Sequence, residues 1–409
     1  MMTAPITRPT RGALDAIMRD GEVETVYQPV VDLDSSDVVG YEALSRGPEG
    51  PLRAPDALFA AARGAGRLTE LDWQCRDAAV TRARHAGVRM PLSLLINAEP
   101  ETLLASREDA SRWGRYADLR CFLELTERAL AADPGRLVAA VDQVRAQDWG
   151  VALDDVGVQP ASLALLPLID PDVIKLDASL LRPPTTPAGV DVGEVVHAVL
   201  THAARTGATV VAEGIETAEH LDLARGYGVA YGQGHLLGRP GPLPDPLPTP
   251  RRTMPVLPRM LDRIVDPGPF ALLVDHGPVR ALTPAAVVEL GRQLLERART
   301  LVPGPAVLVC TPGPLPDAWR VLLDELAADE ARTPVLGVVG HRQPGVVTTP
   351  LAPDDPAGRD LAVAVVTAHF AAALAARPQP ARRDRYDAGL TLDRATAVAI
   401  ANSLLRRVD

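Results

Sequence analysis

Lysine is almost absent from this chain of 409 residues, because one of its 42 basic side chains is lysine and all the others are arginine. The single lysine, Lys175, lies in an apolar run at 173–177 that is typical of a buried strand. A compact ammonium fits a tight polar pocket that a planar guanidinium would overfill. A surface lysine kept by chance is the alternative, but a position at the end of a core strand favours a site residue.

Cysteine, net positive charge and long apolar segments are also scarce. The three cysteines form no CxxC pair, which argues against a disulfide framework or a zinc ribbon and predicts a reducing, cytoplasmic location. The net charge of −10 argues against a nucleic-acid groove or contact with an anionic membrane. No stretch reaches the roughly 18 to 20 apolar residues of a membrane helix. The segment 361–376 comes closest, and we interpret it as a buried helix because it carries Thr367 and His369.

Short apolar runs alternate with amphipathic stretches through the first part of the chain. The runs lie at 26–31, 38–45, 92–97, 121–126, 151–155, 173–177, 209–213 and 229–233. Helical spacing of apolar residues occurs at 54–85, 134–147 and 194–206. Eight strands joined by helices predict a closed TIM-like (β/α)₈ barrel, so the expected fold class is α/β.

The chain is expected to have four parts: an N-terminal extension at 1–20, the barrel at 21–240, a Pro-rich linker at 241–258 and a smaller α/β domain at 259–409. The proline run at 240–250 is too dense for a helix or a central strand and indicates a stiff linker. In the last part we expect strands at 270–275, 306–310, 334–339 and 346–351. We expect helices at 284–299, capped by Thr283, and at 318–328 and 392–407.

Polar side chains end nearly every predicted barrel strand. They are Glu42, Asn97, Glu124, Asp154, Asp155, Asp177, Glu213 and Gln233. The carboxyl ends of barrel strands form one rim, where active sites of this fold lie. One acidic residue at a strand end is commonly a helix cap or a turn residue. That explanation does not easily cover so many positions together.

Several carboxylates at one rim would repel each other unless a cation balanced them. Ligands that are all oxygen, including the Asn97 carbonyl, suit Mg²⁺ or Mn²⁺ better than zinc. The adjacent pair Asp154 and Asp155 is typical of a site for two divalent cations, which is a common device for phosphodiester hydrolysis. Lys175 could then stabilise charge that develops at the phosphorus. Arg46 could hold a phosphate oxygen, unless it is an exposed loop residue.

Ordered motifs between residues 27 and 240 resemble the EAL family, whose members are cyclic di-GMP phosphodiesterases with a TIM-like barrel. The motifs are Tyr27-Gln28-Pro29-Val30, Tyr41-Glu42-Ala43-Leu44-Ser45-Arg46, Ile96-Asn97 with Pro100, Glu124-Leu125-Thr126-Glu127, Leu153-Asp154-Asp155, Ile174-Lys175-Leu176-Asp177, Ala212-Glu213-Gly214-Ile215-Glu216, and Gln233-Gly234 through Gly238-Arg239-Pro240. The triplet Glu-Ala-Leu alone would carry no weight, whereas this ordered series is highly specific.

The resemblance implies a role for each matching residue. Glu42, Asn97, Glu124 and Asp154 would bind a first metal, while Asp154, Asp155 and Glu213 would bind a second. Lys175, Glu213 and Gln233 would act in catalysis on the hydrolytic water, and Arg46, Leu44 and Gln28 would bind substrate. Glu127, Asp177 and Glu216 would support the site.

The resemblance also implies hydrolysis of cyclic di-GMP to linear pGpG by metal-activated water, in a protein that forms a homodimer. The alternative is a receptor that binds cyclic di-GMP, turns it over little and signals through a C-terminal sensory domain whose ligand is unknown. A barrel phosphodiesterase for another substrate is a more distant option. A pure receptor would have no need for both aspartates and the lysine, so their presence favours catalysis.

One loop departs from the family pattern. Active members usually continue Asp-Asp-Phe-Gly-Thr-Gly, whereas this chain has Gln159 in place of the second glycine, followed by Pro160. A positive φ at Gln159 would cost about 1 kcal/mol or more. Because this loop couples metal binding to dimerisation in the family, we expect turnover and regulation to differ here while the metal ligands are kept. A smaller departure is His235, where an aromatic residue often stands.

Overall fold

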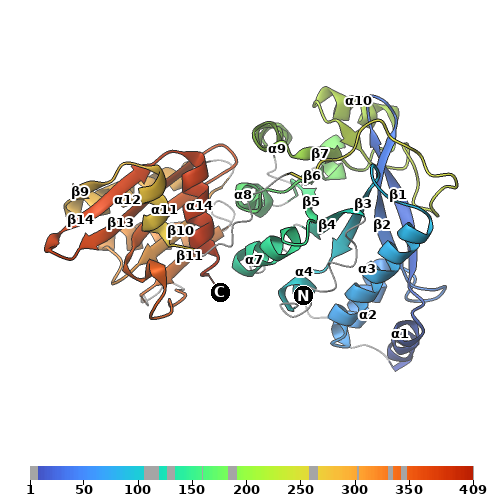
Figure 1. The fold of residues 1–409 in the computed structure, drawn as a ribbon, viewed down its shortest axis with the longest axis horizontal. Coiled ribbons are helices and arrows are strands. Elements are labelled where there is room, and N and C mark those ends of the chain that lie inside the picture. Colours follow the sequence, from blue (N-terminus) through green and yellow to red (C-terminus); the bar gives the residue numbers. More distant parts are fainter. Residues whose placement is uncertain are drawn as a thin grey trace.

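Two sheets organise the chain in the computed structural model, which describes residues 8–105, 119–126, 134–158, 160–182, 191–257, 266–301, 304–329, 335–341 and 348–408. Within these ranges eight strands form a closed barrel and six form a second, open sheet, and the two lie side by side (Figure 1). The expected TIM-like barrel followed by a smaller α/β unit is therefore confirmed. Among the described residues, no helix combines the length and apolar character needed to cross a bilayer.

All eight expected barrel strands are present. They are β1 (Glu24–Asp32), β2 (Val38–Arg46), β3 (Ser93–Ala98), β4 (Arg120–Thr126), β5 (Gly150–Val156), β6 (Val173–Leu176), β7 (Thr209–Ala212) and β8 (Tyr231–Gly232). Strands β2 to β8 run parallel to one another, but β1 is antiparallel to both β2 and β8. The antiparallel β1 is a departure from a regular (β/α)₈ barrel that the strand pattern did not indicate. The connection from Asp32 to Val38 is too short for the crossover that a parallel pair needs, so these strands form a hairpin.

Helices cover the outside of the barrel. They are α2 (Pro55–Gly64), α3 (Leu68–His85), α4 (Pro100–Ala105), α7 (Pro134–Arg145), α8 (Pro160–Ile169), α9 (Val192–Thr206) and α10 (Ala218–Gly226), with a short 3₁₀ turn, η2 (Ala178–Leu181). The predicted N-terminal extension contains α1 (Arg8–Asp20), whose buried Leu14 and Ile17 belong to one apolar cluster with Leu58 of α2. Most of the extension is thus packed onto the barrel.

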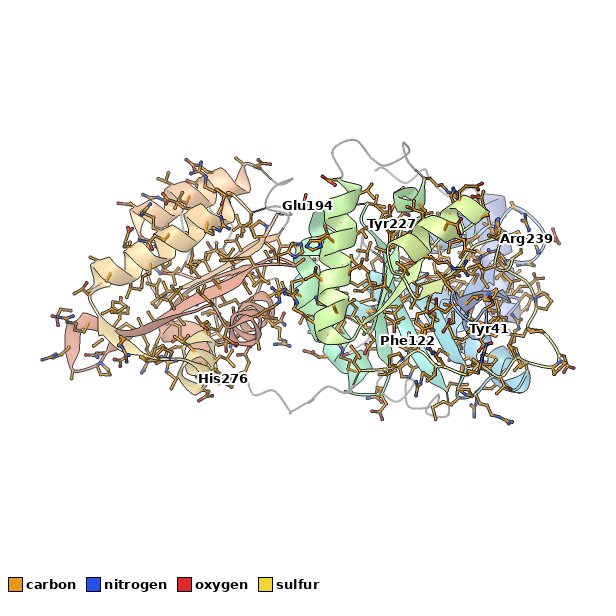
Figure 2. All side chains as sticks on the ribbon, turned by 90° about the horizontal axis from the view of Figure 1, so that it is seen from above. Tyr41, Phe122, Glu194, Tyr227, Arg239 and His276 are labelled. Carbon is orange, nitrogen blue, oxygen red and sulfur yellow. The ribbon has the colours of Figure 1, made fainter. Side chains whose placement is uncertain are left out.

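The Pro-rich segment is fastened to the barrel. Gly241 exchanges two backbone hydrogen bonds with Tyr27 at 2.7 and 3.1 Å, and the Leu257 amide donates to Asp172 at 2.8 Å. Between them, Met254 is fully buried in the inner layer that includes Phe122 and Val173. Figure 2 shows Phe122 inside the barrel. Because Val173 begins β6, Met254 closes the end of the barrel opposite the rim.

The second sheet has the strand order β11-β10-β12-β13-β14-β9. Its elements are α11 (Pro269–His276), β9 (Arg280–Leu282), α12 (Pro284–Ala298), β10 (Ala306–Thr311), α13 (Asp317–Ala327), β11 (Val335–Gly340), η3 (Pro356–Arg359), β12 (Leu361–Val366), β13 (Ala371–Gln379), β14 (Arg382–Thr391) and α14 (Arg394–Leu405). Helices α12 and α13 cover one face, while α11 and α14 cover the other. The expected helices α12, α13 and α14, the Thr283 cap, and strands β10 and β11 are confirmed.

Three predictions for this part were wrong or incomplete. The segment 361–376 lies in the β12–β13 hairpin rather than a helix, 270–275 lies in helix α11 rather than a strand, and neither β9 nor β14 was predicted. Every residue of β12 is buried because the strand is covered on both faces, so no alternation marked it as a strand. Pro269 suits the first turn of α11. The predicted strand at 346–351 lies partly outside the described residues, and Thr349 forms only an isolated bridge.

We expect Met254→Ala to lower the free energy of unfolding by about 2 to 5 kcal/mol, because it leaves a cavity in the inner layer of the barrel. Urea denaturation would measure the change. Met90→Ala is the matched control, since Met90 is 61% exposed. Equal stability of the two variants would contradict the closing role of Met254.

Candidate active site

Lys175 lies at the centre of the barrel rim, with its side chain 1% exposed. Its Nζ is 2.8 Å from Glu124 Oε1, 2.8 Å from Glu213 Oε1, 2.9 Å from Asp154 Oδ1 and 3.3 Å from Glu42 Oε2. These carboxylates come from β2, β4, β5 and the residue after β7. The closed barrel therefore brings together residues that are far apart in the sequence around one ammonium group.

The carboxylates and the ammonium shift one another's pKa values. Burial alone would lower the pKa of Lys175, but the surrounding carboxylates, Asp154 foremost, raise it well above its usual range. Burial raises the pKa values of Glu124 and Glu213 well above normal, with further increases from neighbouring carboxylates. Burial also acts to raise the pKa of Glu42, yet Lys175 and two amide hydrogen bonds outweigh it, so this pKa is lowered. The cluster has more negative groups than Lys175 alone can balance.

Two amide side chains orient Glu42. Gln233 Nε2 donates to Glu42 Oε2 at 2.6 Å, and Asn97 Nδ2 donates to Glu42 Oε1 at 3.0 Å. Gln233 Oε1 and Glu124 Oε2 are buried and have no hydrogen-bond partner among the residues that the structure describes. Buried oxygens without donors are costly unless something else satisfies them. These oxygens are suitable ligands for a hard cation.

Asp155 extends the cluster toward solvent. Asp154, Asp155 and Glu213 each offer a carboxylate oxygen, and these oxygens lie within 4.8 Å of one another. Asp155 has a φ of +56°, which is uncommon for a residue other than glycine and here turns the chain at the end of β5. Burial and the Asp154 charge raise the pKa of Asp155 to about 6. The donor set of carboxylates and amide oxygens fits divalent cations such as Mg²⁺ or Mn²⁺.

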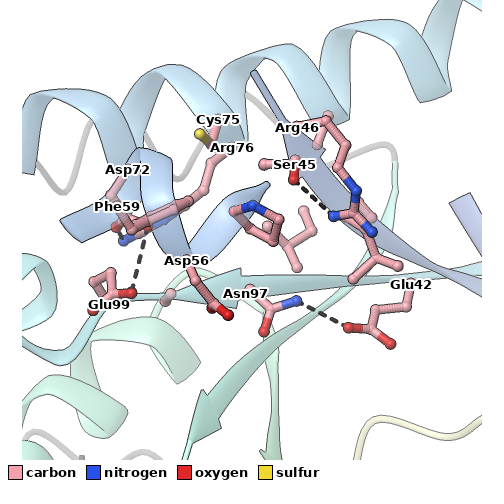
Figure 3. A pocket seen from close by; sticks show the side chains of 16 residues that line it. Glu42, Ser45, Arg46, Asp56, Phe59, Asp72, Cys75, Arg76, Asn97 and Glu99 are labelled. Carbon is pink, nitrogen blue, oxygen red and sulfur yellow. Dashed lines mark hydrogen bonds and ion pairs between the residues drawn. The ribbon is translucent and has the colours of Figure 1, made fainter. Parts of the chain in front are cut away.

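Two cavities flank Glu42. One, of about 240 Å³, is lined by Glu42, Leu44, Arg46 and Asn97 together with residues of α2 and α3. Figure 3 shows Arg46 and Asn97 beside this cavity with Glu42, and Arg46 donates to the Ser45 carbonyl at 2.8 Å. The other cavity, of about 190 Å³, is lined by Gln28, Glu42, Glu213, Glu216, Gln233 and His235 among others. A ligand at the rim thus has room on both sides of Glu42.

The sequence did not reveal the wall of the larger cavity. Asp56, Phe59, Asp72, Cys75, Arg76 and Glu99 also line it. Asp72 and Arg76 form a buried ion pair on α3, with side chains 2% and 1% exposed. Arg76 also lies over the Trp73 ring, 4.6 Å from its centroid. Oppositely charged residues four positions apart could have been noticed, but such pairs on helices are usually exposed and carry little energy.

The remaining predicted residues lie around the cluster. Asp177 caps η2, since its Oδ1 accepts from the Ser179 amide at 2.8 Å. Glu216 is exposed and forms an ion pair with Arg182 at 2.9 Å. Gln28 Nε2 donates to the Gly238 carbonyl at 3.2 Å. Glu127 and Gln159 lie outside the described residues, so their predicted effects stay predictions.

We expect Mn²⁺ to bind more tightly as the pH rises from about 5.5 to 8. In the metal-free protein, protons occupy carboxyl groups with raised pKa values, including Asp155 at about 6, and a cation must displace them. Each displaced proton should strengthen binding by up to about tenfold per pH unit. Calorimetric titrations in buffers of different ionisation enthalpy would measure both affinity and proton release.

Asp155→Asn should reduce both the affinity for Mn²⁺ and the number of protons released when Mn²⁺ binds. The control is Asp222→Asn, since Asp222 is exposed on α10. Binding that weakened with rising pH would contradict the assignment of these carboxylates as ligands.

Comparison with known proteins identifies the barrel. The EAL domain family model matches residues 11–240, more than half of the chain. The cyclic di-GMP phosphodiesterase NbdA of Pseudomonas aeruginosa is 32% identical over 238 residues, which cover 55% of this chain and 30% of NbdA. The cyclic di-GMP phosphodiesterase PA2567 of the same organism is 31% identical over 223 residues, 53% of this chain and 38% of PA2567. The match therefore spans less than two-fifths of either relative.

A solved structure shares the fold. The PaMucR phosphodiesterase in complex with c-di-GMP aligns with a TM-score of 0.50 and 24% identity, over 57% of this chain and 98% of the solved PaMucR chain. With the closed barrel and the family match over residues 11–240, the chain belongs to the EAL domain family.

Proposed function

We propose that the barrel hydrolyses one phosphodiester bond of cyclic di-GMP to give linear pGpG. Family membership and relatives named as cyclic di-GMP phosphodiesterases support this function. The observation that carries the proposal is the rim cluster, in which Lys175 Nζ lies 2.8 to 3.3 Å from four carboxylates beside Asp155. Such a cluster of buried acids around one ammonium is costly to maintain, which is expected of a functional site.

The donor set would hold two divalent cations, Mg²⁺ or Mn²⁺. We assign Glu42, Asn97, Glu124 and Asp154 to one cation, and Asp154, Asp155 and Glu213 to the other. Bound at these oxygens, the cations supply Lewis acidity that favours ionisation of water and stabilises negative charge on the phosphate. Glu124 Oε2, which has no hydrogen-bond partner within the described parts of the chain, and the convergence of Asp154, Asp155 and Glu213 support this assignment.

The protein's own side chains would position the reactants. Lys175 holds the carboxylates in place, and its ammonium would also stabilise charge that develops at the phosphate. Gln233, oriented by Glu42, has a free carbonyl oxygen among the described residues and would orient the attacking water. Arg46 would hold a phosphate oxygen from the larger cavity, where Leu44 would contact a base. Gln28 would contact the substrate from the smaller cavity.

Asp177 and Glu216 would support the rim through the 3₁₀ turn and the Arg182 ion pair. The homodimer, the cytoplasmic location, the linker at 241–258 and the sensory role of the domain at 259–409 stay predictions.

Purified full-length protein incubated with cyclic di-GMP and Mn²⁺ should produce pGpG, detected by liquid chromatography. Removal of the cation with a chelator should stop the reaction. Binding of cyclic di-GMP without product after hours would instead identify a receptor. Product from other cyclic or linear nucleotides, but not from cyclic di-GMP, would identify a phosphodiesterase with another substrate.

Lys175→Arg should reduce turnover by at least about a hundredfold, because the larger guanidinium cannot occupy the centre of the cluster while donating to the same atoms. Single-turnover rates with Mn²⁺ would measure the loss. Circular dichroism and Mn²⁺ titration would check that the variant is folded and still binds cation. Turnover within a few-fold of the wild type would refute the role of Lys175.

A further inference from the structure

Helix α8 is apolar on all sides. Its sequence from Pro160 to Ile169 contains no charged residue, and every residue from 163 to 169 is buried. A helix on the outside of a barrel normally has a polar face toward water, whereas a helix that is apolar all round is covered on both sides. The composition of α8 therefore indicates that its outer face is covered by another part of the protein.

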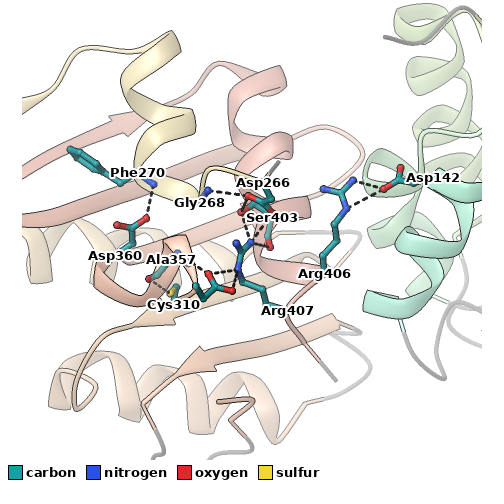
Figure 4. Close-up of polar contacts among 11 residues, drawn as sticks. Asp142, Asp266, Gly268, Phe270, Cys310, Ala357, Asp360, Ser403, Arg406 and Arg407 are labelled. Carbon is teal, nitrogen blue, oxygen red and sulfur yellow. Dashed lines mark hydrogen bonds and ion pairs between the residues drawn. The ribbon is translucent and has the colours of Figure 1, made fainter. Parts of the chain in front are cut away.

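The C-terminal domain provides this cover. Figure 1 shows α14 next to α7 and α8, and the Asn402 amide donates to the Leu168 carbonyl at 3.1 Å. At the edge of the contact, Arg406 donates twice to Asp142 Oδ2, at 2.8 and 3.1 Å (Figure 4). Leu168 of α8 and Leu404 of α14 belong to one apolar cluster that continues from the barrel to the sheet. The two domains therefore share a core.

Helices α7 and α14 approach each other at Gly135. A Cβ atom added at Gly135 would lie 2.4 Å from the carbonyl oxygens of Leu405 and Val408, both of them backbone atoms. Because both oxygens belong to the backbone, no change of side-chain rotamer could relieve such a contact. Glycine at this helical position lowers helix propensity. Its presence is explained by the close approach of the C-terminal domain.

The contact also reaches α9. Arg205 Nη2 donates to the Ala368 carbonyl in the β12–β13 turn. In the same place the His197 and His369 rings stack, with their centroids 5.1 Å apart. The C-terminal domain thus holds three consecutive barrel helices, α7, α8 and α9.

Two of these helices adjoin the Asp154–Asp155 end of β5. Asp155 and Gly157 both have positive φ, +56° and +112°. Gly157 lies between η2 and α9, since a Cβ there would be 2.8 Å from both Leu180 and Val195. Helix α8 begins three residues later, at Pro160. An uncommon backbone conformation persists where the surrounding structure holds it.

We propose that the C-terminal domain is an intramolecular clamp that keeps Asp155 in its metal-binding position by holding α8 and α9. If the C-terminal domain separated from α8 and α9, the backbone after β5 would no longer be held in place, and cation binding at Asp155 would weaken. The inference rests on the metal site of the proposed function but not on its substrate. A signal received by the C-terminal domain would act by changing this contact.

The test compares full-length wild type with Gly135→Val, which places a side chain against the backbone of α14. Gly226→Val is the matched control, because no atom of the described residues lies within 4 Å of a Cβ at this other helical glycine. Small-angle X-ray scattering would report domain separation, and hydrogen exchange would report opening of α8. The electron paramagnetic resonance signal of free Mn²⁺, which decreases when the ion binds, would give the Mn²⁺ affinity.

Gly135→Val should enlarge the particle, speed exchange in α8 and weaken Mn²⁺ binding by about tenfold, a typical size for coupling between sites. Gly226→Val should match the wild type. Separated domains with unchanged Mn²⁺ affinity would overturn the clamp, and so would unchanged scattering and exchange in Gly135→Val.

If Gly135→Val does not fold, the double variant Asn402→Leu with Arg406→Ala provides the same comparison. It removes the hydrogen bonds to Leu168 and Asp142 without adding a side chain that clashes with the backbone. A wild type that binds no Mn²⁺ would overturn the clamp together with the metal site. A wild type that binds Mn²⁺ but makes no pGpG would count against the proposed substrate alone.

Discussion

The ammonium of Lys175 is the interaction on which the rim depends. Glu124 is fully buried, and Glu42 and Asp154 are mostly buried, so their charges could not remain close together without a cation. The Lys175 ammonium lies 2.8 to 3.3 Å from an oxygen of each of these carboxylates and of Glu213. A planar guanidinium is too large to occupy the point between the four carboxylates, whereas a compact ammonium with three rotatable N–H donors fits there. This requirement explains why one lysine stands in a chain that otherwise uses arginine.

The geometry of this cluster follows from closure of the barrel. Gln233 and Glu42 are 191 positions apart, yet their side chains are hydrogen bonded because β8 and β2 both flank β1. The barrel is also closed at its other end, where Met254 of the Pro-rich segment completes the inner layer. The segment after the family match at 11–240 is therefore part of the packed barrel.

The sequence predicted the barrel and its rim because both depend on local patterns. Short β-branched runs marked the strands, and the polar residue at the end of each run marked the rim. Tertiary packing decided what the patterns could not show. The β12–β13 hairpin is buried on both faces, so its apolar run had no periodicity to distinguish strand from helix. Asp72 and Arg76 resembled an ordinary surface pair until the fold buried them beside the rim.

The interface between the domains also has a signal in the sequence. An outer helix without a polar residue to face water, as in 163–169, requires a cover, and α14 supplies it. The same helix follows directly from the strand that carries Asp154 and Asp155. The chain thus fastens its C-terminal domain to the barrel through the Pro-rich segment, through α14 along the side and through the β12–β13 turn at α9. Of these attachments, the α14 contact involves the helix that leads out of the metal site, so it is the route by which the domain can affect chemistry at the rim.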